Sequence, residues 1–220
     1  MNTEAANGKR CVVIGASPET DTDIIRAHIT PTDHIYCADG GYACAKELGL
    51  IPELVMGDFD SGEKPGDGEA EYIALPVKKD DTDTMAIIRE CLKRGYDSFL
   101  LFGMTGGRFD HTLANLSVLY YLAKRGKAAW MIDRHGSTRV LCSGRTALNG
   151  QRGKGFGIFP FACEELRLSL KGFEYELENG VLSADFPMGA SNTIISHCAE
   201  IGILSGNAVI TVTENNENAE

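Results

Sequence analysis

The 220-residue sequence lacks the features that mark several classes of protein. It has no apolar run near the roughly 20 residues that a membrane-spanning helix needs. Its polar start, MNTEAANGKR, is not followed by the apolar stretch of a secretory signal. Its seven cysteines form no C-x-x-C pair, which disfavours a zinc site or a disulfide framework and favours reduced thiols. We therefore expect a cytoplasmic protein without a membrane partner.

The sequence is also short of basic residues. It has 21 Lys and Arg against 31 Asp and Glu, for a formal net charge of -10. Nucleic acids and anionic membranes attract clustered Lys and Arg, so we expect neither as a partner. The acids are concentrated between residues 58 and 83. The stretch SGEKPGDGEAE in that region is typical of a solvated loop, but the aspartates on either side of it need another explanation.

The first part of the chain alternates short apolar runs with segments of helical periodicity. The runs predict strands over residues 11–15, 34–38, 53–57, 72–75, 98–103 and 128–132. The periodic segments predict helices over residues 82–95 and 110–126. This alternation predicts an α/β domain over residues 9–133, with helices on both faces of a mostly parallel sheet. Such sheets bind ligands beyond the carboxyl ends of their strands.

The second part of the chain consists of short alternating runs separated by turns. The runs cover residues 138–142, 154–161, 165–177, 193–197, 200–204 and 208–213. They predict a smaller antiparallel β-sandwich-like domain over residues 138–213. The polar end, residues 214–220, is expected to be a disordered tail.

Four polar clusters follow predicted strands or open helices in the α/β part: CADGG, GDFDS, KKDDTD and GMTGGRFDH. In a parallel sheet these clusters converge on one rim. Seven aspartates would gather there, and their mutual repulsion calls for a cation. Oxygen ligands without His or Cys favour Mg²⁺. The seven are Asp39, Asp58, Asp60, Asp80, Asp81, Asp83 and Asp110.

The same clusters contain groups that suit phosphate. Lys79 and Arg108 are basic residues among the acids, and such residues bind phosphate oxygens. Two glycine pairs, Gly40 with Gly41 and Gly106 with Gly107, would let a ligand approach the backbone closely. The chain has no Walker P-loop, so we expect any nucleotide to bind without one.

Each cluster also has a structural interpretation. GDFDS is typical of a turn at a strand end; as a continued strand it would place Asp58 and Asp60 on one face and Phe59 on the other. Asp80 and Asp81 are typical helix N-caps. His111 opens a predicted helix, where a surface or capping role is the alternative to a general base.

Taken together, the clusters resemble the thiamin pyrophosphokinase (thiamin diphosphokinase) family. The matching segments are CADGG (37–41), IPELVMGDFDS (51–61), KKDDTD (78–83) and GMTGGRFDHTLANL (103–116), with weaker matches in KGFEYEL (171–177) and MGASN (188–192). The resemblance implies a homodimer with active sites at the subunit interface. It also implies Mg²⁺-dependent transfer of diphosphate from ATP to the hydroxyethyl group of thiamin, giving thiamin diphosphate and AMP.

The resemblance also assigns roles to residues of this sequence. It implies Asp58, Asp60 and Asp83 as Mg²⁺ ligands and catalytic residues, with Asp110 and Arg108 as further catalytic residues. The residues implied to bind the nucleotide are Asp39, Gly40, Gly41, Lys79, Asp80, Thr82, Gly106, Gly107 and Arg108. Those implied to bind thiamin are Ser191, Asn192 and Tyr175.

The sequence departs from the family pattern at two positions. Tyr42 follows CADGG where the family commonly has a small residue, and Gly62 follows GDFDS where it commonly has an apolar one. Two other functions stay open. The chain could be a diphosphokinase for another hydroxymethyl heterocycle, such as a pterin, or a non-catalytic sensor of Mg-nucleotide or thiamin.

Overall fold

The computed structural model describes residues 9–59, 63–66, 68–78 and 80–214. The chain divides into two compact units at the junction of Arg134 and His135, and each unit is described by itself. In the described part of the chain, no helix has the length and apolar character needed to cross a membrane. Apart from Glu214, the predicted tail lies outside the described residues.

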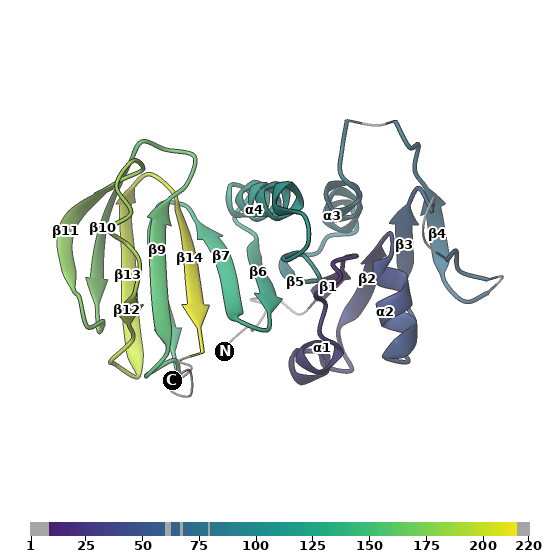
Figure 1. Cartoon of the computed structure of the whole chain (residues 1–220), viewed down its shortest axis with the longest axis horizontal. Helices are drawn as coiled ribbons and strands as arrows, with labels where there is room; N and C mark the ends of the chain where they lie inside the picture. The colour runs from purple at the N-terminus through teal and green to yellow at the C-terminus, as the bar shows by residue number, and fades with distance from the viewer. Residues whose placement is uncertain (1–8, 60–62, 67, 79, 215–220) are drawn as a thin grey trace. The chain divides into compact units, whose positions relative to one another are not determined.

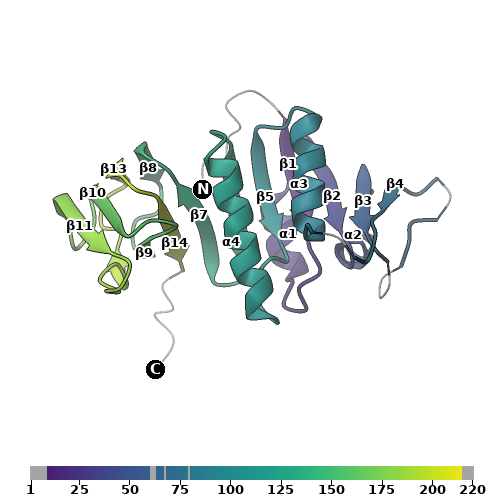
Figure 2. The ribbon, with the colours of Figure 1, turned by 90° about the horizontal axis from the view of Figure 1, so that it is seen from above.

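The first unit is an α/β layer structure, as the sequence predicts. Its described strands are all parallel and pair in the order β6-β5-β1-β2-β3-β4. They are β1 (Arg10–Ile14), β2 (His34–Ala38), β3 (Leu54–Gly57), β4 (Glu71–Ala74), β5 (Ser98–Phe102) and β6 (Ala128–Asp133). Helices α1 (Thr22–His28) and α2 (Gly41–Glu47) cover one face, and α3 (Asp83–Lys93) and α4 (Phe109–Ala123) cover the other (Figures 1 and 2).

The central strands are buried because helices pack on both of their faces. All five residues of β5 are buried, as are four of the five in β1, as expected for near-continuous apolar strands of a covered parallel sheet. On the α1–α2 face, Val12 and Ile14 pack with Ile25 and Tyr42. Trp130 in β6 belongs to the same cluster and is 8% exposed, so it lies in the core of this unit.

The order of the strands creates a switch point between β1 and β5. From β1 the chain moves through β2 and β3 to β4 at one edge, and α3 then returns it to β5 on the other side of β1. The loops that follow β1 and β5 therefore lead away in opposite directions. In open α/β sheets a crevice opens at such a point, beyond the carboxyl ends of the strands.

The second unit is a β-sandwich. Strands β12, β9, β14 and β7 pair antiparallel in this order, and β11, β10, β13 and β8 form a second antiparallel sheet. Phe156, Leu168 and Ile210 belong to the buried cluster between the sheets. The strands are β7 (Gly136–Leu141), β8 (Gly144–Asn149), β9 (Gly155–Pro160), β10 (Glu165–Lys171), β11 (Leu177–Ser183), β12 (Asn192–Thr193), β13 (Cys198–Ser205) and β14 (Ala208–Thr213).

The sequence misplaced several elements of this unit. The run 165–177 is not one strand, because β10 ends at Lys171 and Gly172 turns the chain with φ 84°. The run 193–197 contains only the end of the two-residue β12. Strands β8 and β11 were not predicted. Most of their residues are exposed or half-buried, so they carry little apolar alternation to detect.

Candidate functional site

The α/β unit contains a pocket of about 620 Å³ beyond the carboxyl ends of its strands. Its walls are the segments that follow β1, β2, β3 and β5, together with the first turns of α3 and α4. It therefore occupies the crevice expected at the switch point between β1 and β5. All four polar clusters predicted to converge contribute to this pocket. Their lining residues include Asp39, Asp58, Asp83 and Arg108, one from each cluster.

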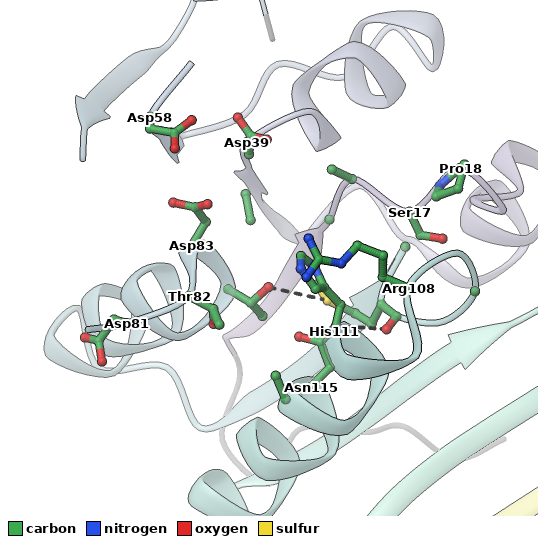
Figure 3. Close-up of a pocket in the computed structure, with 18 of the residues that line it drawn as sticks. Ser17, Pro18, Asp39, Asp58, Asp81, Thr82, Asp83, Arg108, His111 and Asn115 are labelled. Carbon is green, nitrogen blue, oxygen red and sulfur yellow. Dashed lines mark hydrogen bonds between the residues drawn. The ribbon is translucent and has the colours of Figure 1, made fainter. Parts of the chain in front are cut away.

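Three carboxylates stand on one side of this pocket. Asp39 follows β2, Asp58 follows β3, and Asp83 is the first residue of α3. Figure 3 shows their side chains gathered around the same space, while Arg108 reaches toward the pocket from the loop after β5. Carboxylates that face one another repel unless positive charge is near. The arrangement is therefore suited to a cation or to a ligand that brings one.

The donor chemistry of this corner fits Mg²⁺. Within the described residues, no group of three or more His, Cys, Asp and Glu side chains is placed to hold a metal ion by itself. Asp60, the remaining predicted ligand, lies outside them. Mg²⁺ usually takes only one or two carboxylates and completes its shell with water and phosphate oxygens. Asp58 and Asp83 supply such a partial set.

The described residues after Gly57 in GDFDS, Asp58 and Phe59, do not continue β3. The strand ends at Gly57, and Phe59 takes the left-handed φ of 53°, which is a rare conformation for a bulky residue. A continued strand is therefore excluded at Phe59, which agrees with the interpretation of the segment as a turn at the strand end. The Phe59 ring still points inward, since it packs against the core and meets Tyr72 edge-on with centroids 6.0 Å apart.

The start of α3 is fixed by Thr82. Its side chain accepts a hydrogen bond from the Met85 N–H at 3.1 Å and caps the helix. Asp81 instead pairs with Arg89 at 2.6 Å, so neither Asp80 nor Asp81 is the cap. Thr82 lines the pocket and Asp80 does not, while Lys79 lies outside the described residues.

Arg108 and Asp110 form a pair at the start of α4. Arg108 lines the pocket and donates hydrogen bonds to both carboxylate oxygens of Asp110, at 2.5 and 3.1 Å. These bonds lower the pKa of Asp110, so its carboxylate is a weaker base than an ordinary aspartate. Asp110 is not among the lining residues, whereas His111 is.

The glycine pairs have different surroundings. Gly106 lines the pocket; Gly40, Gly41 and Gly107 do not. A Cβ at Gly41 would lie 2.0 Å from the Ile14 carbonyl oxygen, so glycine is needed there for α2 to pack against β1. Contact of any of these four glycines with a nucleotide stays a prediction.

Tyr42, which departs from the family pattern, is built into the fold. It is 3% exposed, and its hydroxyl donates to Glu69 at 2.8 Å. Burial and this hydrogen bond raise the pKa of Tyr42. Glu69 also accepts from the Gly66 N–H at 2.9 Å. The tyrosine thus ties α2 to the acidic segment that follows GDFDS.

The residues predicted to bind thiamin lie in the β unit. Asn192 is 8% exposed, and its side chain bonds the backbone of Tyr175 twice: Oδ1 accepts from the N–H at 3.0 Å and Nδ2 donates to the carbonyl at 2.9 Å. Tyr175 itself is 64% exposed, and Ser191 precedes Asn192 with the left-handed φ of 57°. Asn192 therefore joins two loops and presents the side chain of Tyr175.

Several uncharged residues of the pocket were not predicted from the sequence. Ser17 and Pro18, which follow β1, line the pocket. Met104 after β5 and Asn115 in α4 line it as well. Asn115 is buried and its Nδ2 donates to the Met104 carbonyl at 2.8 Å, which holds the loop after β5. The place of Ser17 and Pro18 in the sequence could have identified them, because any segment that follows β1 at the switch point borders the crevice.

In comparisons with known proteins, one family model matches the α/β part of the chain and a second matches the β part. Residues 26–131 match the family model described as "Thiamin pyrophosphokinase, catalytic domain", and residues 145–210 match "Thiamin pyrophosphokinase, vitamin B1 binding domain". The chain is 29% identical over 163 residues to the thiamine pyrophosphokinase of Bacillus subtilis, covering 71% of this chain and 76% of that protein.

The chain is also similar to a second relative and to a solved structure. The chain is 28% identical over 153 residues to thiamin pyrophosphokinase 1 of Caenorhabditis elegans, covering 65% of this chain and 63% of that protein. The crystal structure of the Bacillus subtilis thiamine pyrophosphokinase aligns with a TM-score of 0.83 at 23% identity, over 94% of this chain and 99% of that one. This structural likeness shows a shared fold.

Proposed function

The chain belongs to the thiamin pyrophosphokinase family, and from this premise we propose that it transfers a diphosphate group from ATP to the hydroxyethyl group of thiamin. The products would be thiamin diphosphate and AMP. The observation that carries the proposal is the pocket where three aspartates from three segments face an arginine from a fourth. The comparisons favour neither the pterin diphosphokinase nor the sensor.

The aspartates would hold the metal end of the triphosphate. Asp58 and Asp83 would bind Mg²⁺, with Asp39 beside them and Asp60 from the same motif as Asp58. Bound Mg²⁺ would supply positive charge to the phosphate oxygens. The acidic corner also suits the cationic thiazolium ring of thiamin, because unlike charges attract across a pocket that is partly shielded from water.

Arg108 would bind the triphosphate from the opposite side. Its guanidinium group lines the pocket, and planar bidentate donors suit phosphate oxygens. The thiamin hydroxyl would attack the β-phosphorus in line, with catalysis coming from positioning and from stabilising charge on the transferred group. Asp110 is a poor base because Arg108 lowers its pKa, so we do not assign it the role of general base.

In the β unit, Tyr175 and Ser191 would contact thiamin, with Asn192 orienting the loop that carries Tyr175. The hydrogen bonds between Asn192 and the Tyr175 backbone support this assignment. The implied homodimer and cytoplasmic location are further parts of the proposal.

The proposal is tested by incubating the purified protein with ATP, Mg²⁺ and thiamin and identifying both products by chromatography and phosphorus NMR. We expect thiamin diphosphate and AMP. Thiamin monophosphate with ADP would overturn attack at the β-phosphorus. The absence of any thiamin product would overturn the proposed activity.

A pair of variants tests the assignment of the pocket. Asp58→Asn should lower kcat by about 100-fold or more, the scale of losing one preorganised electrostatic group, without unfolding the protein. Asp81→Asn is the matched control, since Asp81 also lines the pocket but pairs with Arg89, and it should stay within about threefold of wild type. Equal effects of the two substitutions would contradict the assignment.

The shared site of the proposed dimer has its own test. An Asp58→Asn variant and an Asn192→Ala variant would be unfolded together, refolded as a mixture and assayed. If each site takes its nucleotide end from one subunit and its thiamin end from the other, the mixed dimers regain activity. Activity that stays at the level of the separately refolded variants would contradict the shared site.

A further inference from the structure

The segment after β1 supports the glycine loop that follows β5. We call residues 15–20 the backing segment and residues 103–107 the glycine loop. The Ser17 hydroxyl donates to the Thr105 carbonyl at 2.5 Å, and the Ser17 N–H donates to the Gly103 carbonyl at 3.2 Å. The Pro18 ring lies against Gly107, where a Cβ would meet it at 3.2 Å. The two segments are therefore in contact along most of their length.

Glu19 makes the most specific of these contacts. Its carboxylate accepts a hydrogen bond from the Gly107 N–H at 3.3 Å and pairs with Arg134 at 3.4 Å. It also lies flush against Gly106, since a Cβ there would sit 2.5 to 2.8 Å from the carboxyl atoms of Glu19. Gly106 has φ 86°, so glycine is required both by the conformation and by the approach of Glu19.

Glu19 contacts the glycine loop without being part of the pocket wall. Gly106 and Arg108 line the pocket, whereas, within the described residues, Glu19 and Gly107 are absent from its walls. A ligand in the pocket would therefore meet the loop and Arg108 without touching Glu19. Arg134 places a positive charge beside the carboxylate, which weakens the repulsion between Glu19 and a nearby phosphate.

We propose that Glu19 is a positioning residue for the nucleotide. By holding the Gly107 N–H and packing against Gly106, it fixes the path of the chain into Arg108 and thereby the place of the guanidinium group in the pocket. This inference rests on the proposed function, because it takes the nucleotide triphosphate as the ligand of the glycine loop and Arg108. A mobile loop would still bind ATP, but part of the binding free energy would be spent on ordering it.

The experiment compares three substitutions at Glu19. Glu19→Ala removes the hydrogen bond, and Glu19→Asp keeps the charge but shortens the side chain so that it no longer reaches Gly107. Glu19→Gln keeps both the length and the accepting oxygen. We expect KM for ATP to rise about tenfold in the first two, equivalent to about 1.4 kcal/mol, with kcat within about twofold of wild type. Glu19→Gln should stay within about threefold of wild type in both constants.

The control is Asp23→Asn, which removes a carboxylate that is 91% exposed on the nearby helix α1 and should change neither constant. A lower KM in Glu19→Ala would mean that the carboxylate competes with phosphate, and it would overturn the proposal. An unchanged KM in Glu19→Ala and Glu19→Asp would overturn it as well. The proposal would also be overturned if KM for ATP rose in Glu19→Gln as in Glu19→Ala but stayed at the wild-type value in Glu19→Asp. The charge of the side chain, and not its hydrogen bond, would then decide KM.

Binding of a non-hydrolysable ATP analogue with Mg²⁺, measured by calorimetry, separates this inference from the proposed function. The same order of affinities is expected, with Glu19→Ala and Glu19→Asp weaker than wild type. If the wild type binds the analogue but makes no thiamin diphosphate, the proposed function fails and the affinities of the variants still decide the role of Glu19. If the wild type does not bind the analogue, the inference about Glu19 fails.

Discussion

The ion pair between Arg10 and Asp33 should be one of the main stabilising contacts of the α/β unit. Arg10 begins β1, and its Nε and Nη2 atoms donate to the two Asp33 oxygens at 2.7 and 2.6 Å. Asp33 also accepts from the Thr30 N–H at 2.7 Å, and Arg10 donates to the His28 carbonyl at 3.0 Å. The side chains retain only 12% and 2% of their exposure. The pair therefore joins β1 to the segment between α1 and β2, largely away from water.

Asp33→Asn should destabilise the α/β unit by about 3 kcal/mol. The substitution keeps the shape of the side chain but leaves the Arg10 charge partly buried without its counter-ion, and breaking a buried pair costs about 3–5 kcal/mol. We take the low end because Arg10 keeps some contact with solvent and the amide can still accept one hydrogen bond. Asp23→Asn is the control: Asp23 is 91% exposed and lies 3.7 Å from Arg26, so its loss should cost less than about 0.5 kcal/mol.

The assay is urea unfolding followed by the fluorescence of Trp130. It is the only tryptophan of the sequence and is buried in β6 of the same unit as Asp33. The signal therefore reports this unit even if the β unit unfolds separately. The midpoint should fall in Asp33→Asn with the denaturant slope unchanged, because the surface exposed on unfolding is the same.

The difference in free energy of unfolding between wild type and Asp33→Asn should depend on pH. Burial by itself raises the pKa of Asp33, but hydrogen bonds from Arg10 and Thr30 outweigh it and lower the pKa below its usual range. A carboxyl with a lowered folded pKa stabilises the protein above its unfolded pKa, near 4, and loses this contribution as the pH falls through the folded value. The loss of stability in Asp33→Asn should be full at pH 7 and should shrink below about pH 4. A deficit under about 0.5 kcal/mol at pH 7 would refute the reasoning.

Three further predictions concern the two proposed substrate ends. Thr82→Ala should cost about 1 kcal/mol of stability by removing the cap of α3, with Thr82→Ser close to wild type, as measured by urea unfolding; equal losses would contradict the capping role. Chelation of Mg²⁺ by EDTA should abolish product formation and excess Mg²⁺ should restore it, while Asp58→Asn should need more Mg²⁺ for half-maximal rate; an unchanged Mg²⁺ requirement would contradict metal binding by Asp58. Asn192→Ala should raise KM for thiamin about tenfold while leaving KM for ATP within twofold, since it releases the Tyr175 backbone; steady-state kinetics with each substrate varied would contradict this if both constants moved together.

The α/β unit could be predicted from the sequence because its central strands are buried on both faces. Runs such as FLLF at the end of β5 are apolar and buried, and the periodicity of α3 and α4 predicts those two helices. The short helices α1 and α2 were not predicted, and α2 has no side-chain cap. The switch point, and with it the pocket rim, follows from parallel strands whose loops end on the same side. Asp39, Asp58 and Asp83 were therefore predictable as neighbours before any contact was known.

The remainder depends on contacts between residues far apart in sequence. Nothing in the segment after β1 predicts that Ser17 and Glu19 bond the loop after β5, since these contacts span 88 residues. In the β unit, strands β8 and β11 are mostly exposed or half-buried, and their pairing partners rather than their own residues decide that they are strands. The conformation of Phe59 is likewise set by the core that its ring enters.

The residues that face the pocket and the residues that support its walls should be distinguishable by the effect of their loss. Asp58 faces the pocket, so its substitution should change turnover and the Mg²⁺ requirement with little change in stability. Thr82, Asn115 and Glu19 hold backbone segments through hydrogen bonds to N–H or carbonyl groups. Substituting these three should act on substrate affinity or local stability first, and a variant that keeps the accepting or donating atom should recover both. Low identity to relatives at an unchanged fold is then expected, because a backbone hydrogen bond can be supplied by several side chains, whereas a metal-binding carboxylate has few substitutes.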